Sequence, residues 1–262
     1  MTLLPLELPG AAPDTGEEWV RTRAREGLAA TRRLVERLRE SPPVHALETL
    51  RLWDEATLRL SDVAAVAELF SNVHPDEGVR TAAEEAEQEV ARLRTQLGLD
   101  RRLYDVLVAL DPAGLDAPAA RLLEKTLRDF RRAGVDRDEE TRSRIASVNA
   151  RLTEVGQQFS RTIRDDVRTV RVASHRLAGL PEDWLESHPG DDDGLVTVTT
   201  DYPDAIPVRT FCHDAEVRRE LTRAFLDRGW PAAQPLLREL FDLRHERARL
   251  VGYDTWADLD AE

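Results

Sequence analysis

The apolar residues between positions 145 and 163 recur at steps of three and four, the repeat that marks one face of an α-helix. They are Ile145, Val148, Leu152, Val155, Phe159 and Ile163. The pattern predicts a single long helix from about residue 138 to about residue 166. It spans only about three heptads, and a coiled-coil seam needs about three to four clean ones. The pattern therefore favours a buried helix that crosses the body of the protein, with a coiled coil as the alternative.

Helical periodicity also dominates the sequence before this segment. Helices are expected over about residues 15–40, 44–71, 76–98, 100–110 and 118–133. Thr15, Asp76 and Asp100 are the expected N-caps, because their side-chain oxygens can accept the first free amides of a helix. Residues 41–43 (Ser-Pro-Pro) and Gly134 are the expected stops. In the second helix the candidate buried residues are Leu47, Leu50, Trp53, Leu58, Val63, Val66 and Phe70.

The sequence changes character after residue 166. Residues 167–172 and 195–200 are rich in β-branched side chains and alternate in polarity, which predicts two strands. A short helix is expected near residues 183–186. The aspartate-rich stretch at 190–194 reads as a solvated turn rather than a calcium loop, because the glutamate that closes an EF-hand loop is absent.

Helices are expected again over about residues 215–227 and 235–251, with Asp214 as the cap of the first and Asp254 opening one more turn. The predicted fold class is mainly α: a helical array with a small β excursion near residues 167–210. The sequence reaches Glu262 in the middle of an apparent new helix, so we expect a truncated chain.

Acidic residues outnumber basic ones: Asp+Glu is 50 and Lys+Arg is 37, which gives a net charge of −13. This balance argues against nucleic-acid and anionic-membrane partners, which require a basic surface. The hydrophobic content of 41% is sufficient for a core. The N-terminal segment lacks the basic start of a signal peptide, and no apolar run approaches the ~20 residues of a membrane span. We therefore expect a cytoplasmic protein.

No complete catalytic or metal-binding group emerges from the motifs. None of the six histidines forms a His-x-x-x-His pair. His245-Glu246 begins like the zinc motif His-Glu-x-x-His, but Arg249 stands where the second histidine is needed, so a solvated helix face is expected there. The sequence therefore assigns no metal ligand.

Other reactive side chains have simpler interpretations. The only cysteine, Cys212, is expected to be a small buried residue, so no internal disulfide can form. His213 and Asp214 could be half of a catalytic dyad, but a turn histidine beside a helix cap is favoured. The carboxylate pairs at 139–140 and 165–166 point about 100° apart on a helix and are expected to be surface charge. No catalytic residue is assigned, and the substrate-binding residues stay unknown.

Three segments nevertheless occur in a familiar order. Residues 122–160 contain Glu-Lys-Thr-Leu-Arg-Asp-Phe and Val-Asn-Ala-Arg-Leu-Thr-Glu, residues 202–225 contain Tyr-Pro-Asp-Ala-Ile-Pro-Val-Arg-Thr-Phe-Cys-His-Asp, and residues 236–253 contain Leu-Arg-His-Glu-Arg-Ala-Arg-Leu-Val-Gly-Tyr. Together they resemble the N-terminal portion of the thimet oligopeptidase family of zinc metallopeptidases. That family includes neurolysin, oligopeptidase A and bacterial dipeptidyl carboxypeptidase. The resemblance runs from about His45 to the end.

The resemblance implies a two-lobed helical protein whose channel admits only short, unstructured peptides. In the family, the zinc ligands and the general base belong to His-Glu-x-x-His and a later glutamate, which lie beyond the matched segment. No site residue is therefore carried over to this chain. By the same resemblance, residues 1–166 would form a helical channel wall, residues 167–212 a β-containing connection, and residues 213–262 the start of the catalytic half.

We therefore expect the non-catalytic N-terminal part of an oligopeptidase-like zinc metallopeptidase, inactive alone and without its own cofactor. Its partners would be the missing catalytic half and short peptides in the full-length channel. One alternative is a standalone helical module that binds peptides or proteins without catalysis. Another is an unrelated enzyme that uses Cys212 or His213. Substrate specificity and oligomeric state do not follow from the sequence.

Overall fold

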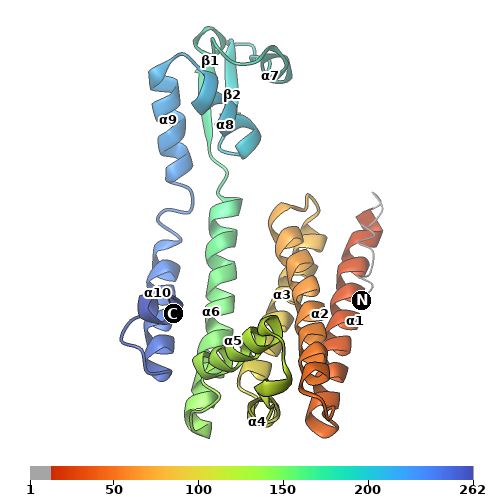
Figure 1. Ribbon diagram of the computed structural model, residues 1–262. Helices are drawn as coiled ribbons and strands as arrows, with labels where there is room; N and C mark the ends of the chain where they lie inside the picture. Colours follow the sequence, from red (N-terminus) through yellow and green to blue (C-terminus); the bar gives the residue numbers. More distant parts are fainter. Residues whose placement is uncertain (1–12, 262) are drawn as a thin grey trace. The chain divides into compact units, whose positions relative to one another are not determined.

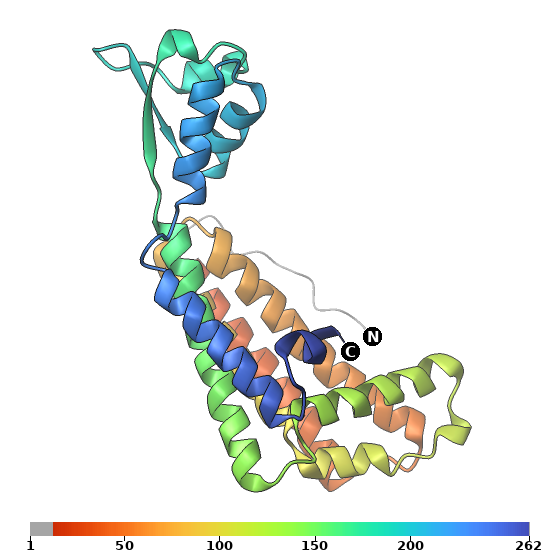
Figure 2. The ribbon, with the colours of Figure 1, turned by 90° about the vertical axis from the view of Figure 1, so that its left-hand side faces the viewer.

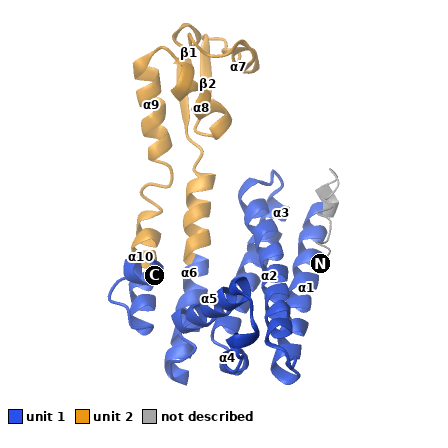
Figure 3. Cartoon of the chain, in the orientation of Figure 1, with its two compact units in different colours: residues 1–154, 241–262 blue, residues 155–240 orange. Residues whose placement is uncertain are grey.

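The computed structural model describes residues 13–261, which are mainly helical (Figure 1). Across these residues there are eleven α-helices, two short 3-10 helices and one two-stranded sheet. The chain divides into two compact units: residues 1–154 together with 241–262, and residues 155–240 (Figure 3). The N-terminal segment, which the sequence predicts not to be a signal peptide, lies outside the described residues. The sequence predicts a different division of the chain, into regions 1–166, 167–212 and 213–262 of a parent peptidase, and that division stays a prediction.

The first unit is built only of helices among its described residues. They are α1 (Pro13–Glu40), α2 (Ala46–Val73), α3 (Glu77–Gly98), α4 (Arg101–Val108), η1 (Pro112–Gly114), α5 (Ala117–Ala133), the first part of α6 (Glu139–Asp165), most of α10 (Gln234–Leu250) and α11 (Trp256–Ala261). Helices α1, α2 and α3 lie side by side. The part of α10 in this unit lies beside the first part of α6, where Glu246 pairs with Arg144 (Figures 1 and 2). Leu28, Leu38, Leu50, Leu103 and Leu107 are fully buried at the centre of this unit.

Some of the helix caps and stops predicted from the sequence are found in the structure, and others are not. Asp76 and Asp100 are N-caps as predicted, each accepting from a backbone N–H at 3.0 Å. Gly134 ends α5 in the left-handed conformation, with φ of 101°. The Thr15 cap is wrong, because α1 already begins at Pro13, and proline is suited to the first turn of a helix. The Asp254 start is also wrong, because Thr255 forms the first cap of α11 by exchanging hydrogen bonds with Asp258.

The buried stripe of α2 differs from the predicted one. Its buried apolar members are Leu50, Ala56, Leu60, Val63, Ala67 and Phe70, and from Ala56 onward they step at three and four. Leu47 is exposed, and Leu58 and Val66 are only half-buried. The prediction favoured large side chains, whereas alanines fill the face where α2 packs closely against its neighbours.

Gly27 is where α1 and α2 come into close contact. An added Cβ at this position would lie 2.3 Å from Val63 Cγ2. We expect Gly27→Ala to reduce the free energy of unfolding by about 1–3 kcal/mol, because the helices must separate. Gly156→Ala is the matched control, since an added Cβ inside α6 meets nothing within 4 Å. It should stabilise the protein by about 0.5–1 kcal/mol through helix propensity. Urea denaturation followed by circular dichroism measures both, and an unchanged Gly27→Ala variant would contradict the close contact.

The second unit packs helices on a two-stranded sheet. Its elements are the end of α6, β1 (Thr169–Ala173), η2 (Ser174–Arg176), α7 (Glu182–Ser187), β2 (Leu195–Thr199), α8 (Tyr202–Phe211), α9 (Ala215–Leu226) and the start of α10. The strands are antiparallel, with Val170 opposite Val198 and Val172 opposite Val196. These four valines are buried, whereas Arg171 and Thr197 are exposed. The predicted alternation is thus confirmed, and the sheet has one covered face.

Helix α8 was not among the predicted helices, because two prolines lie within it. Pro203 sits in the first turn, where no intrahelical amide is needed. Pro207 cannot bond to the carbonyl of Pro203, one turn earlier. The Trp184 indole N–H donates to that carbonyl instead, at 3.3 Å. A side chain from α7 therefore replaces the hydrogen bond that proline removes.

Candidate functional site

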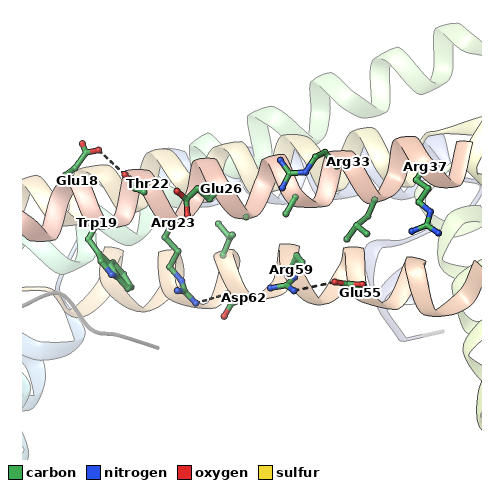
Figure 4. Close-up of a pocket in the computed structure, with 14 residues that line it drawn as sticks. Glu18, Trp19, Thr22, Arg23, Glu26, Arg33, Arg37, Glu55, Arg59 and Asp62 are labelled. Atoms are coloured by element: carbon green, nitrogen blue, oxygen red, sulfur yellow. Dashed lines mark hydrogen bonds and ion pairs between the residues drawn. The ribbon is translucent and has the colours of Figure 1, made fainter. Parts of the chain in front are cut away.

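A groove of about 970 Å³ runs between α1 and α2 in the first unit (Figure 4). It is lined by Glu18, Trp19, Thr22, Arg23, Glu26, Gly27, Ala30, Arg33, Leu34, Arg37, Glu55, Arg59, Asp62 and Val63. The apolar members come from both helices, which are in close contact at Gly27 and Val63. The groove therefore combines an apolar surface with charged walls of both signs.

The charges at one end of the groove are paired. Arg23 Nη2 donates to Asp62 Oδ2 at 2.7 Å, and the Arg23 guanidinium lies 5.4 Å from the centre of the Trp19 ring. Its Nε atom is buried and has no hydrogen-bond partner among the described residues. Farther along the groove, opposite Arg33, Arg59 pairs with Glu55 on the same helix at 3.4 Å (Figure 4). These contacts bring Trp19, Arg23 and Asp62 together, as Figure 4 shows.

The other end of the groove offers unpaired cations. Arg33 and Arg37 are exposed on α1 and form no ion pair within residues 13–261. They flank Leu34, which is partly buried against the core. An extended peptide could place apolar side chains on Leu34 and carboxylates on the two arginines. The groove lining contains no histidine or cysteine, so its arrangement suits binding rather than nucleophilic chemistry.

The structure does not assemble the dyad that His213 and Asp214 could have formed. The Asp214 side chain accepts from the backbone N–H groups of Glu216 and Val217 and from Arg176 Nε at 2.8 Å. The ion pair with Arg176 and these amides lower the pKa of Asp214 to about 2. His213 is exposed, and its backbone N–H donates to Ala178. Asp214 is thus a helix cap held by an arginine.

The remaining candidates from the sequence also have structural partners. Cys212 is buried, and its thiol donates to the Arg176 carbonyl at 3.3 Å. His245 is exposed, whereas Glu246 pairs with Arg144 Nη2 of α6 at 2.9 Å. Arg249, at the position of the missing zinc ligand, pairs with Asp254. The described part of the chain contains no group of three or more side chains that could hold a metal ion, so its residues do not fit a zinc site.

The sequence reasoning missed one cluster, formed by Ser187, His188 and Asp204. Ser187 Oγ lies 3.0 Å from His188 Nδ1, and His188 Nε2 lies 3.0 Å from Asp204 Oδ1. The residue types match a catalytic triad. However, His188 Nδ1 also lies 2.8 Å from the Trp184 carbonyl, to which the Ser187 hydroxyl donates. The Ser187 hydroxyl therefore donates to a backbone carbonyl rather than to the imidazole, so this geometry does not prepare His188 to take a proton from serine.

Asp204 is the structural centre of this cluster. Its Oδ2 accepts from both the backbone N–H of Thr199, at 2.9 Å, and the Thr199 hydroxyl, at 2.6 Å. Burial alone would raise the pKa of Asp204, but these bonds and His188 hold it below its ordinary value. The His188 ring stacks on Trp184 with 3.9 Å between ring centres. The cluster joins α7, β2 and α8, and 16 residues separate its two titratable members in the sequence, so no local motif could reveal it.

Each helix within residues 13–261 is either too short or too polar to span a lipid bilayer.

Comparison with known proteins gives relatives along most of the chain. It is 25% identical over 218 residues to a thimet-like oligopeptidase of Dictyostelium discoideum, a match that covers 80% of this chain and 32% of the relative. It is 30% identical over 239 residues to a mitochondrial intermediate peptidase of Mus musculus, covering 88% and 31%. It is 29% identical over 185 residues to an oligopeptidase A of Haemophilus influenzae, covering 63% and 27%.

These relatives confirm the resemblance to the thimet oligopeptidase family. No model of a known protein family matches the chain. The chain spans about a third of the length of the curated relatives it matches. The mainly helical architecture is consistent with the N-terminal part of such a peptidase.

Proposed function

We propose that this chain is the non-catalytic N-terminal part of an oligopeptidase-like zinc metallopeptidase that hydrolyses short peptides. The observation that carries the proposal is the match to several peptidases over most of this chain but only about a third of theirs. The cleavage chemistry would belong to the remaining two thirds of the parent protein.

The structure supports a binding and scaffolding role for this part. The α1–α2 groove can hold an extended peptide, with Leu34 as an apolar contact and Arg33 and Arg37 as partners for carboxylates. The described residues bring together no metal-holding group, so we assign zinc and its chemistry to the parent protein. The working partners would be short peptides and the catalytic half, in the cytoplasm.

The proposal is tested with the purified 262-residue chain. We expect less than stoichiometric zinc by elemental analysis after dialysis against zinc, and no cleavage of fluorogenic short peptides. A full-length relative such as oligopeptidase A is the positive control for the assay. Zinc-dependent, chelator-sensitive cleavage by this chain alone would overturn its non-catalytic role.

A standalone helical module that binds peptides without catalysis is the second candidate, and the groove between α1 and α2 is the observation that favours it. Reading the gene past the codon for Glu262 separates the two. A frame that stays open to a His-Glu-x-x-His motif supports the peptidase part. An immediate stop codon would overturn it and favour the standalone module.

A further inference from the structure

We propose that the second unit carries a binding surface for short acidic peptides between α8 and α9. This arginine hollow has a volume of about 650 Å³. It is lined by Ile206, Arg209 and Thr210 of α8 and by Ala215, Arg218, Arg219, Thr222 and Arg223 of α9. The inference goes beyond the proposed function, because it concerns a different surface and requires no hydrolysis.

The charge of the hollow stands out against that of the chain. Four guanidinium groups line it, although the protein carries a net charge of −13. Arg209, Arg218 and Arg223 form no ion pair with any carboxylate in the part of the chain that the structure describes. Only Arg219 is paired, with Glu216. The hollow therefore presents positive charge that the protein itself leaves uncompensated.

Contacts with the protein hold two of these unpaired arginines in place. The Arg209 guanidinium lies 5.0 Å from the centre of the Phe225 ring, a cation–π contact that leaves its N–H donors free. Arg218 Nη1 donates to the Cys212 carbonyl at 2.5 Å, which fixes one end of its guanidinium. Ordering these side chains in advance reduces the entropy that binding must overcome. Arginine held in this way is suited to two-point recognition of carboxylates.

The apolar surroundings favour a peptide over a small anion. Tyr202, Ile206 and Leu226 of the same two helices are 65%, 44% and 72% exposed. The Tyr202 ring meets Phe225 edge-on, with 5.7 Å between ring centres, next to the Arg209 contact. Aromatic residues and arginine are enriched where proteins bind other polypeptides. A phosphate would leave these apolar side chains exposed, and the net negative charge of the chain disfavours nucleic acid.

The test is fluorescence anisotropy with a labelled short peptide that alternates glutamate and leucine. We expect the peptide in which glutamine replaces glutamate to bind at least about tenfold more weakly, and added salt to weaken binding of the acidic peptide. The double variant Arg209→Glu/Arg223→Glu should weaken binding of the acidic peptide by about tenfold or more. Arg32→Glu/Arg94→Glu makes the same change in net charge at exposed positions outside the hollow and should bind as wild type does.

Circular dichroism checks that the variants fold. If charge reversal unfolds the unit, peptide binding is measured with Arg209→Gln/Arg223→Gln instead, which removes the two charges and should also weaken binding. Equal binding of the glutamate and glutamine peptides, or equal loss in both double-glutamate variants, would overturn the proposal. Tighter binding of inorganic pyrophosphate than of the acidic peptide would overturn it in favour of a phosphate ligand. A wild-type dimer that the Arg209→Glu/Arg223→Glu variant dissociates would assign the surface to a second copy instead.

Discussion

Replacing Arg247 with alanine is expected to lower the free energy of unfolding of the first unit by about 3–5 kcal/mol. Arg247 is only 7% exposed, and burial lowers its pKa to about 10, so it stays charged at neutral pH. No carboxylate pairs with it in the described structure. Its Nη2 donates to the carbonyls of Arg132 and Ala133, at 3.1 and 3.0 Å, and its Nε to Asn149 Oδ1, at 3.1 Å.

These acceptors explain the size of the effect. The carbonyls of Arg132 and Ala133 belong to the last turn of α5, where the helix has no further N–H groups to donate. Asn149 in turn donates to Thr95 of α3, at 3.2 Å. Arg247 therefore links α10 to α5 and α6, and through Asn149 to α3. Replacing Arg247 with alanine removes these N–H donors, so three buried oxygen atoms lose their hydrogen bonds.

Urea denaturation measured by circular dichroism provides the value, and hydrogen exchange should show the α5 end and α10 losing protection together. Arg244→Ala is the control one turn earlier: this arginine is exposed and its guanidinium lies 5.6 Å from the centre of the Trp256 ring, so about 0.5–1 kcal/mol is expected. Arg247→Lys should fall between the two, because one ammonium cannot reach all three oxygens. A loss below about 1 kcal/mol in Arg247→Ala would show that the network is not required for stability.

In the second unit, too, an arginine from later in the sequence donates to the last carbonyls of a helix, here α6. Arg228 donates to the carbonyls of Ile163, Arg164, Asp166 and Thr200, at 2.9 to 3.2 Å. The backbone N–H of Gly229 donates to Asp166 Oδ2 at 2.7 Å. Thus two long helices end on arginines that come from much later in the sequence. Periodicity locates such helices to within a few residues, but it carries no information about which distant side chain completes their last turn.

The same limit explains what the sequence could and could not predict. The caps at Asp76, Asp100 and Asp214 depend on residues three positions away or fewer, and all three form as predicted. The valine alternation of the strands likewise depends only on neighbours. Helix α8 was missed because it contains Pro203 and Pro207, and the Trp184 indole that donates to the Pro203 carbonyl lies 19 residues away in the sequence. Local chemistry is readable from a sequence, whereas partners that folding brings together are not.

The same distinction between local and distant partners applies to the candidate functional surfaces. Sequence reasoning gave His245-Glu246 no metal role because Arg249 stands where a second histidine is needed, and in the structure Arg249 pairs with Asp254. It could not foresee the groove, because Gly27 and Val63 are brought into contact only by the pairing of α1 with α2. The arginine hollow was equally hidden, since Arg209 and Arg223 belong to a helix that was not predicted and to its neighbour.

Asp204→Ala is expected to reduce the stability of the second unit by about 2–4 kcal/mol. The Asp204 side chain is 14% exposed and accepts two hydrogen bonds from Thr199 and one from His188. Alanine leaves those donors unpaired where β2 meets α8. The neighbouring Asp201→Ala is the control, because Asp201 is exposed and its side chain forms no cap bond, so a change of about 0.5 kcal/mol or less is expected.

The effect of Asp204 should depend on pH in a defined direction. Its pKa in the folded protein lies below the ordinary value of 3.8, so the carboxylate contributes its full stabilisation above about pH 4 and loses it as pH falls through the lowered pKa. The stability difference between wild type and Asp204→Asn should therefore shrink from about pH 5 to about pH 3. Urea denaturation at several pH values measures it. A difference that stays constant or grows on acidification would mean that Thr199 and His188 do not stabilise the charged form of Asp204.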